Sequence, residues 1–354
     1  MAFGYYKSVT INHTQCGSTD ATDFPVTIWI TDADFKTVGN GGKVQNSTGY
    51  DIRPYADSAL TTALTFELVA ATYVATTGAF EMHVKIPTVS HTVDTVFYLA
   101  LGDASISTDG SSTAAWNTGF FAVYHYPNGT ALTLADSTSN ANTQTGTNTP
   151  TAATGTIDGG IGLASASTQR AQSANAQLPG GGSRAGTISV WVKATSFPNA
   201  YNDTAGQNDS TFFFVLMVKS TGKLACYLTP SVGGNINYDG TGSHTLSTAT
   251  WYYLTMVYSS TVGLIGYVNA ASDGTAAANG FLQLGNTPIF TGGDAAFGRN
   301  WNGVIDEMRL SSVVRSADWI TTEYNNQVAG STFLTWGALT PVTPAATPNF
   351  FLLF

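Results

Sequence analysis

The sequence predicts an all-β protein built from two β-sandwich domains. Its 354 residues are enough for two domains with cores of their own, because domains usually hold about 100–200 residues. Charged residues make up only 10% of the chain, and Thr, Ser, Asn, Ala and Gly stand in their place. Thr, Val, Tyr and Phe suit strands, while Gly and Asn suit tight turns. The sequence has no long runs of Ala, Leu, Glu and Lys at helical spacing, which favours strands over helices.

The first domain is expected over residues 1–110. Polar and apolar residues alternate there with the two-residue period of strands, so that Val26, Ile28 and Ile30 share one face. Pro54 lacks the N–H that an inner strand needs, which places its strand at a sheet edge. The strands expected in this domain are 6–11, 24–30, 49–55, 64–69, 80–87 and 95–102.

Four short motifs mark this first domain: YYKSVTI at 5–11, FPVTI at 24–28, DIR at 51–53 and VKIP at 84–87. Together they resemble a small β-sandwich domain of unassigned function. That domain commonly precedes laminin-G-like modules in bacterial and phage surface proteins. The family usually continues D-I-R with Phe, whereas this sequence has Pro54. The resemblance implies a laminin-G-like module further along the chain.

The second domain is expected over residues 120–335. Its strands carry longer motifs: TISVWVK at 187–193, WYYLTMVY at 251–258 and GVIDEMRLS at 303–311. These motifs resemble a laminin-G-like (concanavalin A-like) jelly roll. The resemblance implies a glycan-binding or protein-binding sandwich and not an enzyme, with a short helix over 316–324.

Strand alternation slips at Val304–Ile305, so we expect a β-bulge at the start of that strand. The residues expected at or near the second core are Trp191, Val192, Trp251, Val257, Ile305 and Leu310.

The net charge and the cysteines indicate which classes of partner the protein can bind and in which cellular compartment it folds. A net charge of −9, with a pI near 4.8, argues against a nucleic-acid binder. The first ten residues lack the basic and apolar regions of a signal peptide, and no apolar stretch approaches the roughly 20 residues of a membrane span. Either a leader was removed and a new Met supplied, or the protein is used without export. Cys16 and Cys226 fall in different predicted domains, so we expect two free thiols.

We expect no catalytic residues and no cofactor. Asp306 and Glu307 are adjacent, so in a regular strand they point to opposite faces and cannot form a glycosidase pair. Asp306 is expected to tie down a neighbouring loop and Glu307 to be exposed, with a calcium role left open. The five histidines show no metal-ligand spacing. His83 is expected at the surface, and His125 in packing.

The ligand site expected from the sequence is Asn300, Trp301 and Asn302. A loop indole between two amides can stack on a sugar ring and hydrogen-bond its hydroxyls. The alternative is a loop Trp folded over the edge of the sandwich.

Residues 336–354 form a Pro-rich tail with an apolar end. We expect this end to dock onto other virion proteins or sister copies, giving an oligomer, because five exposed apolar side chains are typical of an interface. The alternative is a tail that folds back onto its own domain. The docking residues are Phe350, Phe351, Leu352, Leu353 and Phe354.

The function expected from these features is that of a non-enzymatic structural virion protein of a bacteriophage. It would decorate the head, form a fibre or belong to the tail, and it would bind host or environmental glycans through the jelly roll. It would be made in the host cytoplasm without a signal peptide. The alternative is a secreted or surface-exposed bacterial adhesin that binds glycans. Neighbouring capsid or tail genes would favour the first, and an omitted leader upstream of Met1 the second.

Overall fold

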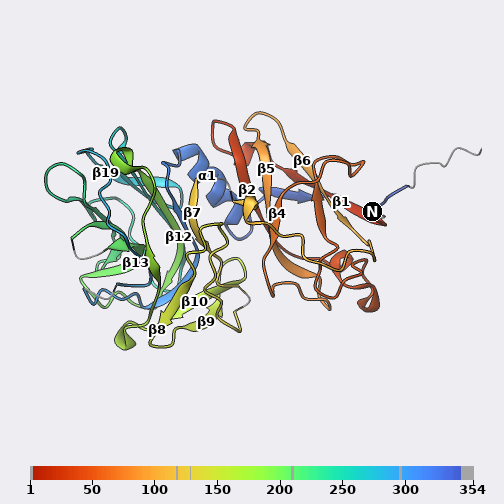
Figure 1. Cartoon of the computed structure of the whole chain (residues 1–354), viewed down its shortest axis with the longest axis horizontal. Coiled ribbons are helices and arrows are strands. Elements are labelled where there is room, and N and C mark those ends of the chain that lie inside the picture. The colour runs from red at the N-terminus through yellow and green to blue at the C-terminus, as the bar shows by residue number, and fades with distance from the viewer. Residues whose placement is uncertain (1–2, 117–118, 128, 209–210, 295–296, 344–354) are drawn as a thin grey trace, which may run out of the picture.

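The computed structural model describes residues 3–116, 119–127, 129–208, 211–294 and 297–343. It confirms the all-β prediction and shows two sandwiches along the long axis of the molecule, with helix α1 (Ala317–Gln327) between them (Figure 1). Six short 3-10 helices lie in connections: η1 (His13–Gln15), η2 (Ala33–Phe35), η3 (Val38–Asn40), η4 (Thr113–Ala115), η5 (Ser165–Ser167) and η6 (Gly181–Ser183). Among the described residues, no helix is long and apolar enough to cross a membrane.

The N-terminal sandwich packs a five-stranded sheet against a three-stranded one. The larger sheet runs β22–β1–β6–β3, with β23 also paired to β1, and the smaller runs β2–β5–β4. Pro54 lies in β3 at the end of its sheet, which confirms the predicted edge position. The strands are β1 (Tyr5–Ile11), β2 (Ala21–Thr31), β3 (Arg53–Tyr55), β4 (Phe66–Leu68), β5 (Ala79–Val89), β6 (Thr95–Leu101), β22 (Leu334–Trp336) and β23 (Thr340–Pro341).

The jelly roll consists of an eight-stranded and a seven-stranded sheet. The first runs β19–β18–β17–β12–β21–β10–β9, with β7 also paired to β21, and the second runs β16–β15–β14–β13–β20–β11–β8. The strands of the eight-stranded sheet are β7 (Phe120–Tyr124), β9 (Thr151–Thr154), β10 (Gly159–Leu163), β12 (Gly186–Ala194), β17 (Trp251–Ser259), β18 (Gly263–Val268), β19 (Ala271–Ala276) and β21 (Gly303–Ser311). Those of the seven-stranded sheet are β8 (Gln144–Thr147), β11 (Arg170–Ala176), β13 (Tyr201–Asn208), β14 (Phe213–Lys219), β15 (Leu224–Leu228), β16 (Ile236–Asp239) and β20 (Thr287–Thr291).

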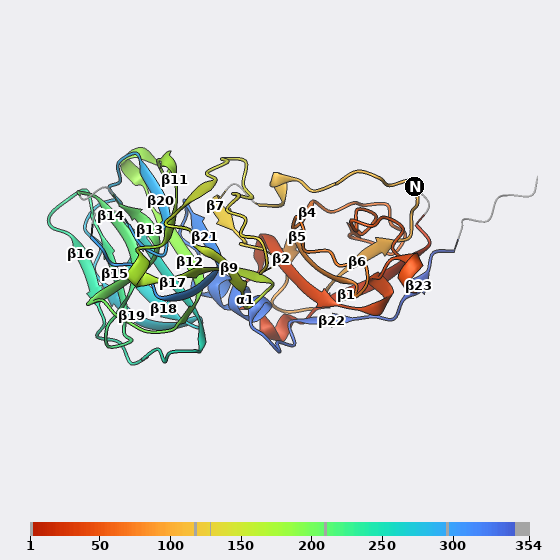
Figure 2. The ribbon, with the colours of Figure 1, turned by 90° about the horizontal axis from the view of Figure 1, so that it is seen from below.

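The two outer faces of the jelly roll have different surroundings. Helix α1 is capped by Ser316, whose side chain accepts a hydrogen bond from the Trp319 N–H. The helix packs Ile320 against Trp191 and Tyr253 of the eight-stranded sheet. The seven-stranded sheet lies on the far side, with strands β14 to β16 at the end of the molecule opposite the N-terminal sandwich (Figure 2). We call the outer face of this seven-stranded sheet the distal face.

The predicted core residues divide between two clusters. Val192, Ile305 and Leu310 lie between the two sheets of the jelly roll. Trp191 and Val257 lie instead on the outer side of the eight-stranded sheet, beneath α1, with Trp251 partly buried beside them.

The β-bulge in β21 lies at Glu307, two residues after the Val304–Ile305 pair where it was predicted. Glu307 has a φ of 48°, and the pairing of β12 with β21 shifts register between Ser189 and Trp191. Ile305 and Met308 therefore both reach the core although they are three residues apart. The extra residue brings Asp306, Glu307 and Arg309 to the outer side of the sheet, so the expectation that Asp306 and Glu307 point to opposite faces is wrong.

After the jelly roll the chain returns to the N-terminal sandwich, which the sequence did not predict. Strand β22 pairs antiparallel with β1, matching Val9 to Trp336, and β23 matches Tyr5 to Pro341. The first residues of the predicted 336–354 tail therefore belong to a sheet of the N-terminal sandwich. The expected docking peptide, residues 350–354, lies outside the described residues.

Candidate functional site

The distal face carries a cavity of about 220 Å³. Cross-strand pairing places Met217, Ala225 and Asp239 in one row across β14, β15 and β16, with Tyr227 and Asn237 paired beside them. Met217 and Ala225 belong to an apolar cluster separate from the inter-sheet core, as strand alternation requires. The residues that line the cavity are Tyr201, Met217, Ala225, Cys226, Tyr227, Asn237, Tyr238, Asp239 and Arg299.

Aromatic rings surround this cavity. Phe213 packs edge-on against Tyr227 with ring centroids 5.0 Å apart, and it meets Phe297 at 5.6 Å. Phe297 is 39% exposed, and Tyr201 and Tyr227 are half-buried, so each of the three presents ring surface to solvent. Partly exposed rings of this kind offer flat apolar surface together with polar edges.

Charged groups lie between these rings. The Arg299 guanidinium sits over the Tyr201 ring at 5.4 Å and over the Phe297 ring at 4.7 Å. The Tyr201 hydroxyl donates to Asp239 Oδ1 at 2.8 Å, and Lys219 Nζ lies 3.1 Å from Asp239 Oδ2. The hydrogen bond to Asp239 raises the pKa of the Tyr201 hydroxyl, so this phenol stays protonated as a donor. The distal face thus combines donors, acceptors and ring surface in one place.

The structure places the predicted ligand residues elsewhere. Trp301 is fully buried in the inter-sheet core, with its ring 6.1 Å from that of Phe197, so its indole is not accessible to a sugar. Asn300 is also buried. Asn302 is half-buried and bonds to the chain itself, accepting from the Ser165 N–H and donating to Ser196 Oγ at 2.8 Å. The loop turns inward because its Trp301 N–H bonds to the Gly292 carbonyl, which corrects the prediction of an exposed indole.

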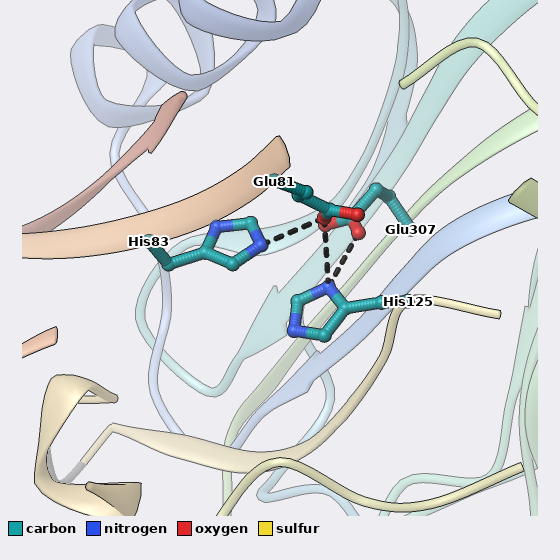
Figure 3. A group of neighbouring side chains, drawn as sticks. All are labelled: Glu81, His83, His125 and Glu307. Carbon is teal, nitrogen blue, oxygen red and sulfur yellow. Dashed lines mark hydrogen bonds and ion pairs between the residues drawn. The ribbon is translucent and has the colours of Figure 1, made fainter. Parts of the chain in front are cut away.

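A second group of polar side chains is buried where the two sandwiches meet, and we call it the interface cluster (Figure 3). It contains Glu81 and His83 from β5, His125 just after β7, and Glu307 from β21. Glu81 Oε1 lies 2.9 Å from His83 Nε2 and 3.6 Å from His125 Nδ1. His125 Nδ1 lies 2.5 Å from Glu307 Oε1. The four side chains are buried, so both sandwiches contribute to one enclosed site.

Further charged residues extend the interface cluster. Arg309 donates to Glu307 Oε2 and to Glu323 Oε1, each at 2.7 Å. Glu67 Oε2 lies 3.4 Å from His125 Nε2 and accepts from the Trp116 indole N–H at 2.7 Å. Glu67, Glu81, Glu307 and Glu323 are all the glutamates of the chain, so every glutamate lies at this interface.

Burial and neighbouring charges raise the pKa values of Glu81 and His125 and lower those of His83 and Glu307. Burial, reinforced by the Glu307 carboxylate, raises the pKa of Glu81 well above its usual range. Burial and the nearby His125 lower the pKa of His83. Burial opposes the charged forms of His125 and Glu307, but their mutual attraction prevails, raising the pKa of His125 and lowering that of Glu307. These directions favour an uncharged Glu81 and an uncharged His83 beside an ion pair of His125 with Glu307.

These positions settle several expectations from the sequence. His83 and Glu307 are buried, so the prediction that both are exposed is wrong. Asp306 does tie down a loop, because its Oδ2 accepts from the N–H groups of Thr156 and Ile157 at 2.8 and 3.1 Å. His125 is buried as expected, with its ring stacked on that of His83.

The calcium role left open for Asp306 and Glu307 gains no support from their surroundings. The two carboxylates face separate donors, backbone N–H groups for Asp306 and cationic side chains for Glu307. The two cysteines are unpaired, with Cys226 buried and Cys16 half-buried.

Comparison with known families concerns the second domain. Residues 165–321 match a laminin-G family described as the concanavalin A-like lectin/glucanases superfamily. This part of the chain is a concanavalin A-like jelly roll. Strands β12, β17 and β21, which carry the three motifs noted in the sequence, all lie in its eight-stranded sheet.

Several solved structures are similar to part of this chain at low sequence identity. Domain 4 of the extracellular arabinanase AbnA from Geobacillus stearothermophilus, in complex with arabinotriose, is 20% identical with a TM-score of 0.48, covering 57% of this chain and 97% of that domain. The binding domain of Paraclostridial Mosquitocidal Protein 1 is 13% identical with a TM-score of 0.46, covering 58% and 52%. The botulinum neurotoxin serotype G binding domain is 10% identical with a TM-score of 0.45, covering 58% and 50%. This chain therefore spans about half the length of the two toxin domains. No curated protein sequence matches the chain.

Proposed function

We propose that the jelly roll is a glycan-binding module and that its distal face is the binding surface. The observation that carries this proposal is a cavity lined by the rings of Tyr201 and Tyr227 together with Arg299 and Asp239, with the Phe297 ring next to it beneath the Arg299 guanidinium. Ring faces suit the apolar C–H surface of a sugar, while a guanidinium and a carboxylate suit its hydroxyls. The description of the matching family, which names lectins and glucanases, is consistent with this ligand class.

We also propose that the protein acts by binding and not by catalysis. A glycosidase needs a pair of carboxyl groups on either side of the scissile bond. Every glutamate of this chain lies at the interface between the sandwiches, away from the distal face, and Glu81 and Glu307 are fully enclosed there. The residues that line the distal cavity include one carboxylic acid, Asp239, and therefore not the pair of Asp or Glu side chains that the reaction needs. This arrangement supports a lectin more than a glucanase.

Replacing Tyr227 with alanine is expected to weaken glycan binding about tenfold, which corresponds to about 1.4 kcal/mol. Tyr227 is half-buried on the distal face, and its ring packs against Phe213, so the substitution removes a stacking surface without opening the inter-sheet core. A glycan array on the wild-type protein would identify a ligand, and calorimetric titration would then compare dissociation constants.

The matched control is Tyr98→Ala, because Tyr98 is a half-buried strand tyrosine that packs on Tyr6 in the N-terminal sandwich. It should bind the glycan as tightly as the wild type. An array without any glycan signal would refute the lectin proposal. Equal weakening by Tyr98→Ala and Tyr227→Ala would move the site away from the distal face.

As the setting for this activity we propose a bacteriophage virion, in which the protein is a structural component of the head, a fibre or the tail. The distal face and strand β23 lie at opposite ends of the long molecule (Figure 2). Such a shape suits a protein that is held at one end, by virion proteins or sister copies, and presents a binding face at the other. The unpaired cysteines are consistent with folding in a reducing compartment.

Co-sedimentation tests this setting. Antibodies against the purified protein should detect it in phage particles banded on a density gradient after lysis of the host. Detection only in the cell-surface or culture-medium fraction of uninfected cells would instead favour the adhesin, for which the same elongated shape would serve.

A further inference from the structure

We propose that Glu81, His83, His125 and Glu307 form a structural zinc site that cross-links the two sandwiches. One ligand atom from each of the four residues lies within 4.8 Å of the others, and all four side chains are buried. Figure 3 shows the side chains directed at one point from both sandwiches, Glu81 and His83 from one and His125 and Glu307 from the other. Two imidazoles with two carboxylates form a mixed nitrogen and oxygen set that suits Zn²⁺ better than Ca²⁺ or Mg²⁺.

The atoms that do not face the proposed ion have their own partners. His83 presents Nε2 to the cluster, while its Nδ1 lies 3.2 Å from Thr27 Oγ1. His125 presents Nδ1, while its Nε2 lies 3.4 Å from Glu67 Oε2. Outer partners of this kind fix the tautomer and the ring orientation of metal-bound histidines.

Glu307 is oriented in the same way. Its Oε1 faces the cluster, while Arg309 donates to its Oε2 at 2.7 Å through one nitrogen and 3.2 Å through another. Three of the four proposed ligands, His83, His125 and Glu307, therefore each have one atom in contact with a residue outside the site and a second atom directed toward the proposed ion. An ordinary buried ion pair does not require this arrangement, because it would be satisfied by the His125–Glu307 contact alone.

The size of the cluster is close to that of a zinc site. Bonds of about 2.0–2.2 Å place the ligand atoms of a tetrahedral site about 3.4 Å apart. Three of the six separations between the ligand atoms are 2.5, 2.9 and 3.6 Å, and all six are within 4.8 Å. Four protein ligands leave no open position, which is typical of a structural and not a catalytic zinc ion.

The charges also balance when zinc enters. Two carboxylates and two neutral imidazoles around a divalent cation carry a net charge of zero, so the four ligands neutralise the ion without a further charged group. Arg309 remains paired with Glu323, at 2.7 Å, outside the zinc ligands.

The test begins by removing the other histidines. His13, His91 and His244 each pair with an aspartate and are partly exposed, so they could bind zinc adventitiously. The full-length, untagged triple variant His13→Gln, His91→Gln and His244→Gln is expressed in zinc-supplemented medium and purified in the presence of a chelator. We expect elemental analysis to find one zinc ion per chain in this variant. Adding His83→Gln or His125→Gln should abolish the bound zinc.

Cobalt provides a readout that does not depend on the additional variants. Grown with Co²⁺ in place of Zn²⁺, the triple variant should show the strong visible absorption of a four-coordinate cobalt ion. If His83→Gln and His125→Gln prevent folding, the zinc content and cobalt spectrum of the triple variant still decide the question. Absence of bound metal and of this absorption would overturn the proposal, leaving a cluster held by protons alone. Full zinc content in a folded variant lacking both His83 and His125 would overturn it as well.

Discussion

Replacing Arg309 with methionine is expected to lower the free energy of unfolding by about 3–5 kcal/mol. Arg309 is 1% exposed and donates to both Glu307 and Glu323, so its loss removes the guanidinium from two buried carboxylates, and Glu307 keeps its contact with His125 alone. It also donates to Thr27 Oγ1 of the N-terminal sandwich at 3.2 Å. One guanidinium therefore joins β21, α1 and β2, and methionine can replace its volume but none of its hydrogen bonds.

Urea denaturation of the purified full-length protein measures this loss. Arg170→Met is the matched control, because Arg170 is a half-buried strand arginine whose hydrogen bonds go to the neutral acceptors Gln172 Oε1 and the Thr168 carbonyl. We expect it to change stability by about 0.5 kcal/mol or less. Equal effects of the two substitutions would show that the charge network around Arg309 contributes little.

The sequence predicted those parts of the fold that depend on local alternation. In β12 the residues Ile188, Val190 and Val192 alternate with Ser189 and Trp191, and the strand lies where the motif predicted it. The edge position of β3 followed from one missing N–H at Pro54. Both inferences needed only information carried within a few residues.

The interface cluster could not be predicted in the same way. In β5, Glu81 and His83 occupy the polar face of an alternating strand, a pattern that normally indicates contact with water. Here that face is covered by the jelly roll. Glu81 lies close to His125 and His83 close to Thr27, and each of these partners is more than 40 positions away in the sequence. Alternation separates polar from apolar faces, but it does not distinguish a solvated polar face from a buried one.

The ligand residues were misplaced for a related reason. Trp301 lies in a polar loop between two asparagines, yet its neighbours fold the indole into the core. The sequence indicates the distal face only weakly. Strand β14 is apolar at nearly every position and therefore presents apolar groups to both sides of its sheet. A strand of this composition predicts a second covered or functional face, although it does not name the residues on it.

Replacing Trp191 with alanine is expected to lower the free energy of unfolding by about 3–5 kcal/mol, the range for large aromatic residues in a packed core. Trp191 is 2% exposed beneath α1, where its ring packs on Tyr253 and Tyr324 and its indole N–H donates to Gln327 Oε1 at 2.7 Å. For a domain of about 150–250 residues this corresponds to a fall in melting temperature of about 6–20 °C, which calorimetry can measure. The matched control is Trp29→Ala, because Trp29 is a strand tryptophan that is 41% exposed, and it should change stability by about 0.5 kcal/mol or less. A loss below about 1 kcal/mol for Trp191→Ala would mean that α1 does not close this side of the jelly roll.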